Sequence, residues 1–174
     1  PGPGDFQGGH QWVISDRLAV DGKFTYSDSS FDLDFQDGVD TVQPSFDIVT
    51  SMNGRSTTAT YYVRPTYETR VDGNYFAPAL RGGDHSTKFG VRYRSTPYST
   101  KTVTGGGAIA RFRNGVPSEA EMRRDGYTTR DLWGFSMYLN DTVRAGRWTW
   151  NLGVRWDYQD DEALATSTEA NPIL

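Results

Sequence analysis

The chain has 174 residues, with 18 Lys and Arg against 22 Asp and Glu, and it contains no cysteine. The net charge of −4 gives no basic footprint for nucleic acid, and the lack of cysteine excludes disulfide scaffolds, cysteine zinc sites and thiol catalysis. No apolar run approaches the roughly 20 residues of a membrane helix, whereas a membrane-spanning β-strand needs only about 9–11 residues of alternating pattern.

Both ends of the chain suggest a piece of a longer protein. The sequence begins Pro1-Gly2-Pro3-Gly4, without an initiator Met or the basic and apolar regions of a signal peptide. It stops at Ile173-Leu174, shortly after a polar stretch. We therefore expect further sequence on either side.

Six β-strands are predicted along the chain, because apolar and polar residues alternate with a period of two. The first strand ends at a turn formed by Asp16-Arg17, and a change of parity after Tyr26 indicates a bulge in the second. In the third strand Pro65 removes one ladder donor and marks a weak point. The expected ranges are 8–15, 18–35, 57–76, 86–112, 129–143 and 147–159.

The last two strands carry the clearest alternation. Between Arg147 and Tyr158 every second residue is apolar, and the strand before it alternates in the same way. A connection over residues 144–147 would pair Val143 with Trp148 and place the apolar residues of both strands on one face. The remaining facing pairs would be Leu139 with Leu152, Met137 with Val154, Phe135 with Trp156, and Trp133 with Tyr158.

The predicted connections alternate in length. Those at 16–17, 77–84 and 144–146 are short, whereas 36–56, 113–128 and the tail from 159 are long and polar. Ser118 followed by Glu121 is a capping-box match, so helix is expected only near 117–124. Short turns at one end and long loops at the other are typical of an outer-membrane β-barrel.

Aromatic residues flank the aliphatic part of the last strand. Trp148 lies at one end, and Trp156 and Tyr158 lie at the other, with Leu152 and Val154 between them. This order matches the two aromatic girdles of a membrane-spanning strand. The predicted membrane-interface residues are Trp133, Trp148, Trp156 and Tyr158.

The opposite, polar faces of the strands are suited to a water-filled lumen. They carry arginines that bind either an anionic substrate or carboxylates inside the barrel, and neither role is assigned to one residue from the sequence. These arginines are Arg64, Arg70, Arg92, Arg94 and Arg155.

Two segments resemble barrel hairpins of TonB-dependent receptors. From Tyr138 to Tyr158 the chain carries an aromatic residue before Asp141, a short turn, and then Leu-Gly-Val-Arg-Trp-Asp-Tyr, similar to the family's Leu-Gly-x-Arg-x-Asp-Tyr. In the second segment, from Gly82 to Tyr93, Gly-x-His precedes Lys-Phe-Gly. Both are most similar to the Oar-like branch, whose full members carry a carboxypeptidase-regulatory-like domain before the plug.

The resemblance implies an all-β, antiparallel up-and-down meander, an open arc of about six strands from a transmembrane barrel of about 22. Residues 1–174 are then a partial barrel without a plug domain or signal peptide. The implied function is uptake of a scarce or large substrate across the outer membrane of a two-membrane (Gram-negative) bacterium. The implied partners are outer-membrane lipid, the remainder of the barrel and plug, and TonB, which acts through the missing N-terminal part.

No cofactor, metal site or catalytic residue is expected, so the chain is predicted not to be an enzyme. His10 and His85 lack a triad arrangement and are too few for a common zinc site. The glycines at 105–107 lack the Lys-Ser/Thr of a P-loop, and the adjacent carboxylates at 160–162 do not form a glycosidase pair. An acidic stretch breaks the EF-hand spacing and is interpreted as a solvated loop rather than a calcium site; its members are Asp28, Asp32, Asp34, Asp37 and Asp40.

Two alternatives stay open. A soluble carbohydrate-binding or adhesion β-sandwich also has alternating strands, with an aromatic platform on its sheet. A small outer-membrane barrel of about eight strands fits the length but needs two more strands than the pattern gives. Extraction distinguishes these hypotheses, because a membrane barrel requires detergent whereas a soluble module does not.

Overall fold

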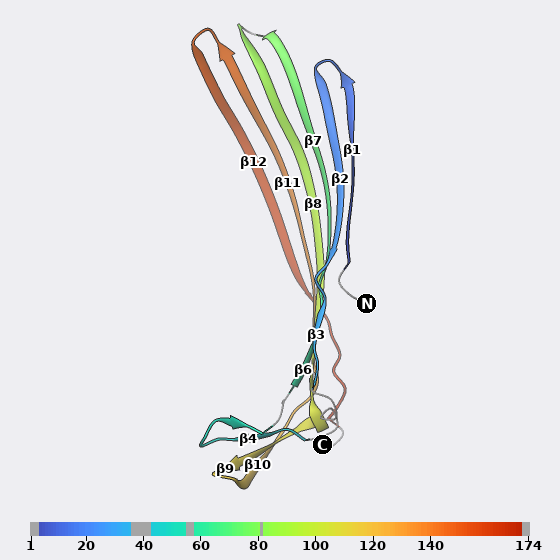
Figure 1. Cartoon of the computed structure of the whole chain (residues 1–174), viewed down its shortest axis with the longest axis vertical. Coiled ribbons are helices and arrows are strands. Elements are labelled where there is room, and N and C mark those ends of the chain that lie inside the picture. Colours follow the sequence, from blue (N-terminus) through green and yellow to red (C-terminus); the bar gives the residue numbers. More distant parts are fainter. Residues whose placement is uncertain (1–3, 36–42, 55–57, 81, 172–174) are drawn as a thin grey trace. The chain divides into compact units, whose positions relative to one another are not determined.

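The computed structural model describes residues 4–35, 43–54, 58–80 and 82–171, most of them in β-strands (Figure 1). The chain divides into two compact units. Unit 1 comprises Pro1–Ser29, Pro65–Pro97 and Asp131–Glu162, and unit 2 comprises Ser30–Arg64, Tyr98–Arg130 and Ala163–Leu174. In the described part of the chain, no helix is long and apolar enough to cross a membrane.

Unit 1 is a meander of long neighbouring strands, as predicted. Their order in the sheet is β1-β2-β7-β8-β11-β12, so β1 and β12 are its edges among the described residues. The register of β1 with β2, of β2 with β7 and of β7 with β8 is antiparallel. The bounds are β1 (Asp5–Ser15), β2 (Leu18–Asp28), β7 (Pro65–Leu80), β8 (Gly83–Thr104), β11 (Gly126–Ala145) and β12 (Trp148–Leu164), of which β8, β11 and β12 continue into unit 2.

The register sorts the side chains of unit 1 onto two faces. On one face Val71 lies opposite Val91, and Tyr26 lies opposite Tyr67 with ring centroids 5.1 Å apart. Glycines on this face are covered by aromatic rings: a Cβ on Gly22 would come within 2.9 Å of the Trp12 ring. The strands therefore expose one predominantly apolar side, as the alternation predicts, although β8 carries Thr87 and His85 on the same side near its start.

Unit 2 contains strand extensions and a second, small sheet. β3 (Phe31–Leu33) pairs with β6 (Thr58–Val63), which pairs with β8. The small sheet has the order β10-β9-β4-β5. Its strands are β4 (Ser45–Asp47), β5 (Met52–Asn53), β9 (Ala108–Arg113) and β10 (Val116–Met122).

Two expectations are wrong in this small sheet. β4 pairs with β9 in parallel, although antiparallel pairing was expected throughout. The two strands come from different long connections, so no hairpin turn imposes an antiparallel direction. The helix expected near 117–124 is instead β10, because Glu121 pairs with Arg111 and Arg123 rather than capping a helix, and the Ser118 hydroxyl donates to the Arg111 carbonyl.

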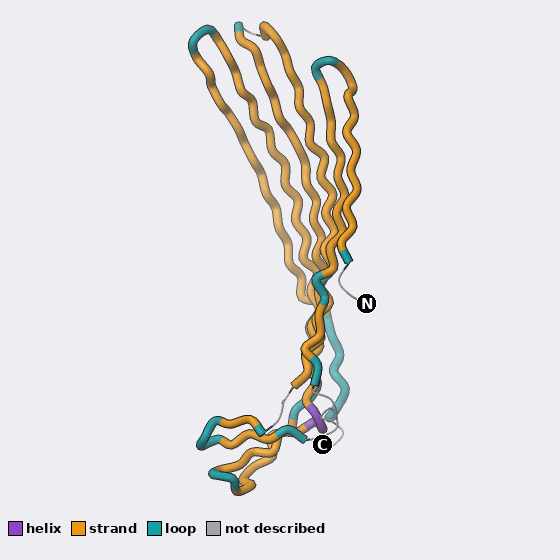
Figure 2. Tube along the Cα trace, in the orientation of Figure 1, coloured by secondary structure: helices purple, strands orange, loops and turns teal. Residues whose placement is uncertain are grey.

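The two strand interruptions lie close to the positions that the sequence predicts, but the end of β8 does not. β2 and β3 are interrupted at Ser29 and Ser30, and β6 and β7 are interrupted at Arg64, next to Pro65. The Arg64 backbone N–H, which has no ladder partner there, donates to the Ser30 hydroxyl at 3.0 Å. The predicted strand 86–112 is wrong as a single element: β8 ends at Thr104, and a 3-10 turn at Gly105–Gly107 leads into β9 (Figure 2).

The last hairpin has a shorter turn than predicted. β11 ends at Ala145 and β12 begins at Trp148, which leaves the two residues Gly146 and Arg147 in the turn. Gly146 has φ of 59°, the backbone that glycine gives to the first position of a type II′ turn. The predicted four-residue connection is therefore wrong, but a shift of two residues leaves every side chain on its predicted face.

The aromatic contacts across this hairpin keep the apolar residues together. The ring centroids of Trp133 and Tyr158 are 5.3 Å apart, and those of Phe135 and Trp156 are 6.1 Å apart. These contacts bring together rings that the alternation predicted on one face of the hairpin.

Candidate functional site

The polar face of unit 1 carries a set of ion pairs. Lys23 lies opposite Arg70, and Arg70 lies opposite Arg92, so three cations share one row across the sheet. The next row places Asp21 opposite Asp72. Charges of one sign repel when they are directly opposite, so the side chains pair between rows instead.

Three of the predicted arginines are paired in this way. Arg70 Nε lies 2.6 Å from Asp72 Oδ2, and Arg92 Nη2 lies 2.5 Å from Glu68 Oε2. Arg155 donates to both carboxylate oxygens of Asp157 at 2.7–3.0 Å. Of the two roles considered for the arginines, pairing with carboxylates of the barrel itself is the one seen for these three.

Tyr138 links two strands that are not neighbours. Its hydroxyl, on β11, donates to Asp72 Oδ1 on β7 at 2.7 Å, and the ring crosses β8 at Gly90. A Cβ on Gly90 would come within 2.6 Å of the Tyr138 ring. Glycine is therefore required where the ring passes over the backbone.

Arg64 lies outside the polar row. It belongs to unit 2, with its guanidinium carbon 4.6 Å from the Tyr62 ring centroid and 5.9 Å from that of Phe31. The two rings stack at 4.5 Å. Within the described part of the chain, this arginine is held by cation–π contacts rather than by a carboxylate.

The predicted interface aromatics form two groups along β12. Trp156 and Tyr158 stack at 6.1 Å and contact β11, whereas Trp148 stacks on Trp150 beside the turn. Between the groups Leu152 is 62% exposed and Val154 is 66% exposed. From Trp148 to Tyr158 the strand rises about 33 Å, or about 25 Å normal to a membrane at a tilt of about 40°, which matches the apolar band of a barrel.

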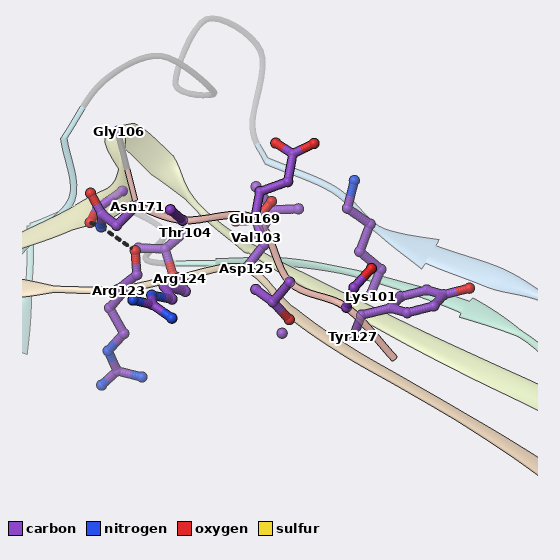
Figure 3. Close-up of a pocket in the computed structure, with 15 residues that line it drawn as sticks. Lys101, Val103, Thr104, Gly106, Arg123, Arg124, Asp125, Tyr127, Glu169 and Asn171 are labelled. Atoms are coloured by element: carbon purple, nitrogen blue, oxygen red, sulfur yellow. Dashed lines mark hydrogen bonds between the residues drawn. The ribbon is translucent and has the colours of Figure 1, made fainter. Parts of the chain in front are cut away.

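A pocket of about 610 Å³ lies within unit 2 (Figure 3). Its wall combines the end of β8, the glycine turn, the start of β11 and the tail at 167–171. Asn171, only 3% exposed, fixes the tail, because its amide donates to the carbonyls of Gly107 at 2.7 Å and Arg123 at 2.6 Å. The Thr166 hydroxyl donates to the Tyr127 carbonyl at 2.9 Å.

The pocket presents charges of both signs. Lys101 and Arg124 are its cations besides Arg123, which pairs with Glu121, and Asp125 and Glu169 are its carboxylates. Hydrogen bonds with Thr129 and Ser99, together with the Lys101 charge, lower the pKa of the Tyr127 phenol despite partial desolvation. No pattern in the sequence indicates this pocket, because its wall comes from segments that are far apart along the chain.

The histidines lie in contacts within the sheet. His85 Nδ1 is 2.6 Å from Asp141 Oδ2, and the Thr87 hydroxyl donates to Asp141 Oδ1 at 3.0 Å. This contact joins the two hairpins on which the family resemblance rests. His10 packs against the Trp12 ring at 4.7 Å.

The structure describes only part of the acidic stretch at 28–40, but all of the carboxylates at 160–162. Asp34 accepts a hydrogen bond from the Tyr61 hydroxyl at 3.0 Å, whereas Asp37 and Asp40 lie outside the described residues. The carboxylates at 160–162 were expected in a loop but lie in β12, which continues to Leu164. Among the described residues there is no group of three or more His, Asp or Glu side chains that could hold a metal ion.

Long neighbouring strands with one apolar exposed side and one charged side define the wall of an outer-membrane β-barrel. Residues 3–172 match the family described as TonB dependent receptor-like, beta-barrel, and the chain belongs to this family. It is thus part of a bacterial outer-membrane protein. No curated protein matches the chain. The Oar-like branch stays a prediction.

Proposed function

We propose that this chain forms wall and surface loops of a receptor that takes up a scarce or large substrate across the outer membrane. The observation that carries the proposal is the family match over nearly the whole chain. In the intact receptor the polar face of unit 1 lines the lumen, which a plug fills. TonB acts through the N-terminal part of the receptor and not through these residues.

Unit 2 is proposed to lie on the outer side of the membrane. The short turns at Asp16–Arg17 and Gly146–Arg147 belong to unit 1, whereas the long connections and the pocket belong to unit 2. Outer-membrane barrels have short periplasmic turns and longer extracellular loops. The pocket then offers a polar surface for first contact with a substrate.

The aromatic groups of β12 and its neighbour are proposed to mark the two membrane interfaces. Trp148 lies on the periplasmic side, and Trp133, Trp156 and Tyr158 lie toward the outside. Indole and phenol rings favour this depth because one part is apolar and the polar tip reaches water.

The sidedness can be tested by cysteine labelling, because the chain itself has no cysteine. In a cysteine-free receptor, Glu119→Cys on β10 should react with a membrane-impermeant maleimide in intact cells. The matched variant Arg147→Cys, at the turn, should react only after the outer membrane is permeabilised. Equal labelling of both variants in intact cells would contradict the proposed orientation.

Uptake itself can be tested without knowing the substrate. Cells with and without the receptor are compared for the compounds that they remove from the medium, each in the presence and absence of TonB. We expect at least one compound whose removal needs both proteins. Identical removal in all four strains contradicts a transport function. Purification of the receptor from membranes without detergent would instead favour the soluble-module alternative.

A further inference from the structure

We propose that a hollow on the polar face of unit 1 binds an oxyanion, a carboxylate or a phosphate group. The hollow has a volume of about 250 Å³. The polar residues around it come from three neighbouring strands: Arg92 and Arg94 of β8, Ser136 of β11, and Arg155, Asp157 and Gln159 of β12. Three guanidinium groups therefore surround this hollow with a single carboxylate.

The three arginines differ in how far their donors are satisfied. Arg155 is bound by Asp157, and Arg92 is bound by Glu68 through one terminal nitrogen. The Nε of Arg92 is nevertheless buried and has no hydrogen-bond partner. Within the described residues, Arg94 has neither an ion pair nor a hydrogen bond. A buried donor without an acceptor is unfavourable, so an acceptor in the hollow is favoured.

The backbone of β11 provides the space. Gly134 lines the hollow, and a Cβ there would meet only the Tyr158 carbonyl oxygen, at 3.4 Å. Neighbouring Ser136 is also small. A larger residue at either position would fill the volume between the arginines of β8 and β12.

The chemistry of the lining selects the ligand class. The planar fork of a guanidinium matches the two oxygens of a carboxylate or phosphate. A cation is disfavoured, because the only carboxylate in the hollow, Asp157, is already held by Arg155. The volume suits one anionic group of a larger molecule, so the site recognises a charge rather than a whole substrate.

Two sources supply the same oxyanion chemistry in the intact receptor. One is a free anion that passes along the lumen, and the other is an acidic side chain from a different part of the protein. The inference rests on the proposed function only in placing the polar face of unit 1 in the lumen. Cysteine labelling tests that placement separately, so failure of the proposed function can be distinguished from failure of the oxyanion site.

The test uses the intact receptor in detergent, with inorganic phosphate as the probe and titration calorimetry as the readout. For a free anion, wild type binds phosphate and Arg94→Gln weakens the affinity at least tenfold. Lys88→Gln removes the same charge from the same strand and face but outside the hollow, and should change the affinity less than twofold.

A second variant separates a shaped site from a general positive surface. Gly134→Leu keeps every charge but fills the hollow, and it should abolish phosphate binding while the receptor keeps its heat-modifiable barrel form on a gel. Unchanged phosphate affinity in Gly134→Leu would overturn the proposal.

If the oxyanion is instead an acidic side chain from another part of the receptor, the expected result is different. Wild type then fails to bind phosphate, and Arg94→Gln lowers the melting temperature of the intact receptor more than Lys88→Gln does, because a buried carboxylate loses its partner. If Arg94→Gln and Lys88→Gln have equal effects on both the phosphate affinity and the melting temperature, the hollow binds neither a free anion nor an acidic side chain, and the proposal is overturned.

Discussion

The two units of this chain are built on different principles. In unit 1 neighbouring strands follow a repeated antiparallel pattern, and one face is predominantly apolar, with the polar cluster of His85, Thr87 and Asp141 near its turn end. In unit 2 the small sheet joins β4 and β9 in parallel from two distant connections. Alternation and short turns are sufficient to define the first unit, whereas individual polar side chains hold the second together.

Asp47 is the clearest of these side chains in unit 2. Its carboxylate accepts hydrogen bonds from the backbone N–H groups of Val49 at 2.9 Å, Thr50 at 3.1 Å and Gly115 at 2.7 Å. The backbone bond from Gly115, with those from Thr50 and Val49, lowers the pKa of Asp47 to about 2. One carboxylate thus fixes the β4–β5 turn against the β9–β10 turn.

The largest expected effect tests the two faces of unit 1. Leu152→Arg, on the apolar side of β12, should cost about 2–4 kcal/mol of folding free energy, because the charge enters the middle of the membrane. Asn151→Arg, one residue away on the polar side, should cost little. Urea unfolding of the intact receptor in lipid measures both variants. Equal penalties would remove the distinction between a lipid face and a lumen face.

A smaller effect is expected where a ring crosses the sheet of unit 1. Gly90→Ala should cost about 1–3 kcal/mol, because the new Cβ displaces Tyr138 and breaks its hydrogen bond to Asp72. Gly134→Ala is the matched control, since its Cβ meets a single atom at 3.4 Å. The same unfolding assay applies. A penalty for Gly134→Ala as large as that for Gly90→Ala would contradict the role of the ring.

In unit 2 the effect should stay local. Asn171→Ala removes the side-chain donor from the Arg123 carbonyl and from the Gly107 carbonyl, which keeps its bond from the Arg123 backbone N–H, at a cost of about 1–2 kcal/mol to the tail. Hydrogen exchange over 165–171 should accelerate roughly tenfold or more, while exchange in β7 and in the unit 1 part of β8, up to residue 97, stays unchanged. Thr168→Ala, in the same tail, is the control. Faster exchange in unit 1 as well would mean that the two units do not respond independently.

The smallest effect is a pH dependence confined to the β4–β9 pairing. The pKa of Asp47 is about 2 in the fold and near its ordinary value of 3.8 when unfolded, so the native state favours the charged form. Its contribution is fully present above about pH 4 and is lost as the pH falls toward 2. The protection factors of the β4 and β9 amides against hydrogen exchange should fall over this window in wild type, and should be low at all pH values in Asp47→Asn. Glu119→Gln, on exposed β10, should leave the window unchanged.

Most of the regular fold could be predicted from the sequence, and the errors have local physical causes. Alternation located the six long strands and their faces, and Pro65 marked a real interruption. The alternation could not determine the length of the turn in the last hairpin, because two-residue and four-residue connections place the same side chains on the same face. The Ser118 and Glu121 pattern predicted a helical turn, but pairing with β9 and the contact of Glu121 with Arg111 stabilise a strand instead.

The candidate sites depended on tertiary structure to a greater degree. The sequence placed Arg70, Arg92, Arg94 and Arg155 on one polar face, because side-chain direction in a strand is a local property with a period of two. Only the register decided that Arg92 meets Glu68 and Arg155 meets Asp157, while Arg94 stays beside an open hollow at Gly134. Pairings between distant segments, including β4 with β9 and Asn171 with Gly107, arise from long-range packing, which no local pattern encodes.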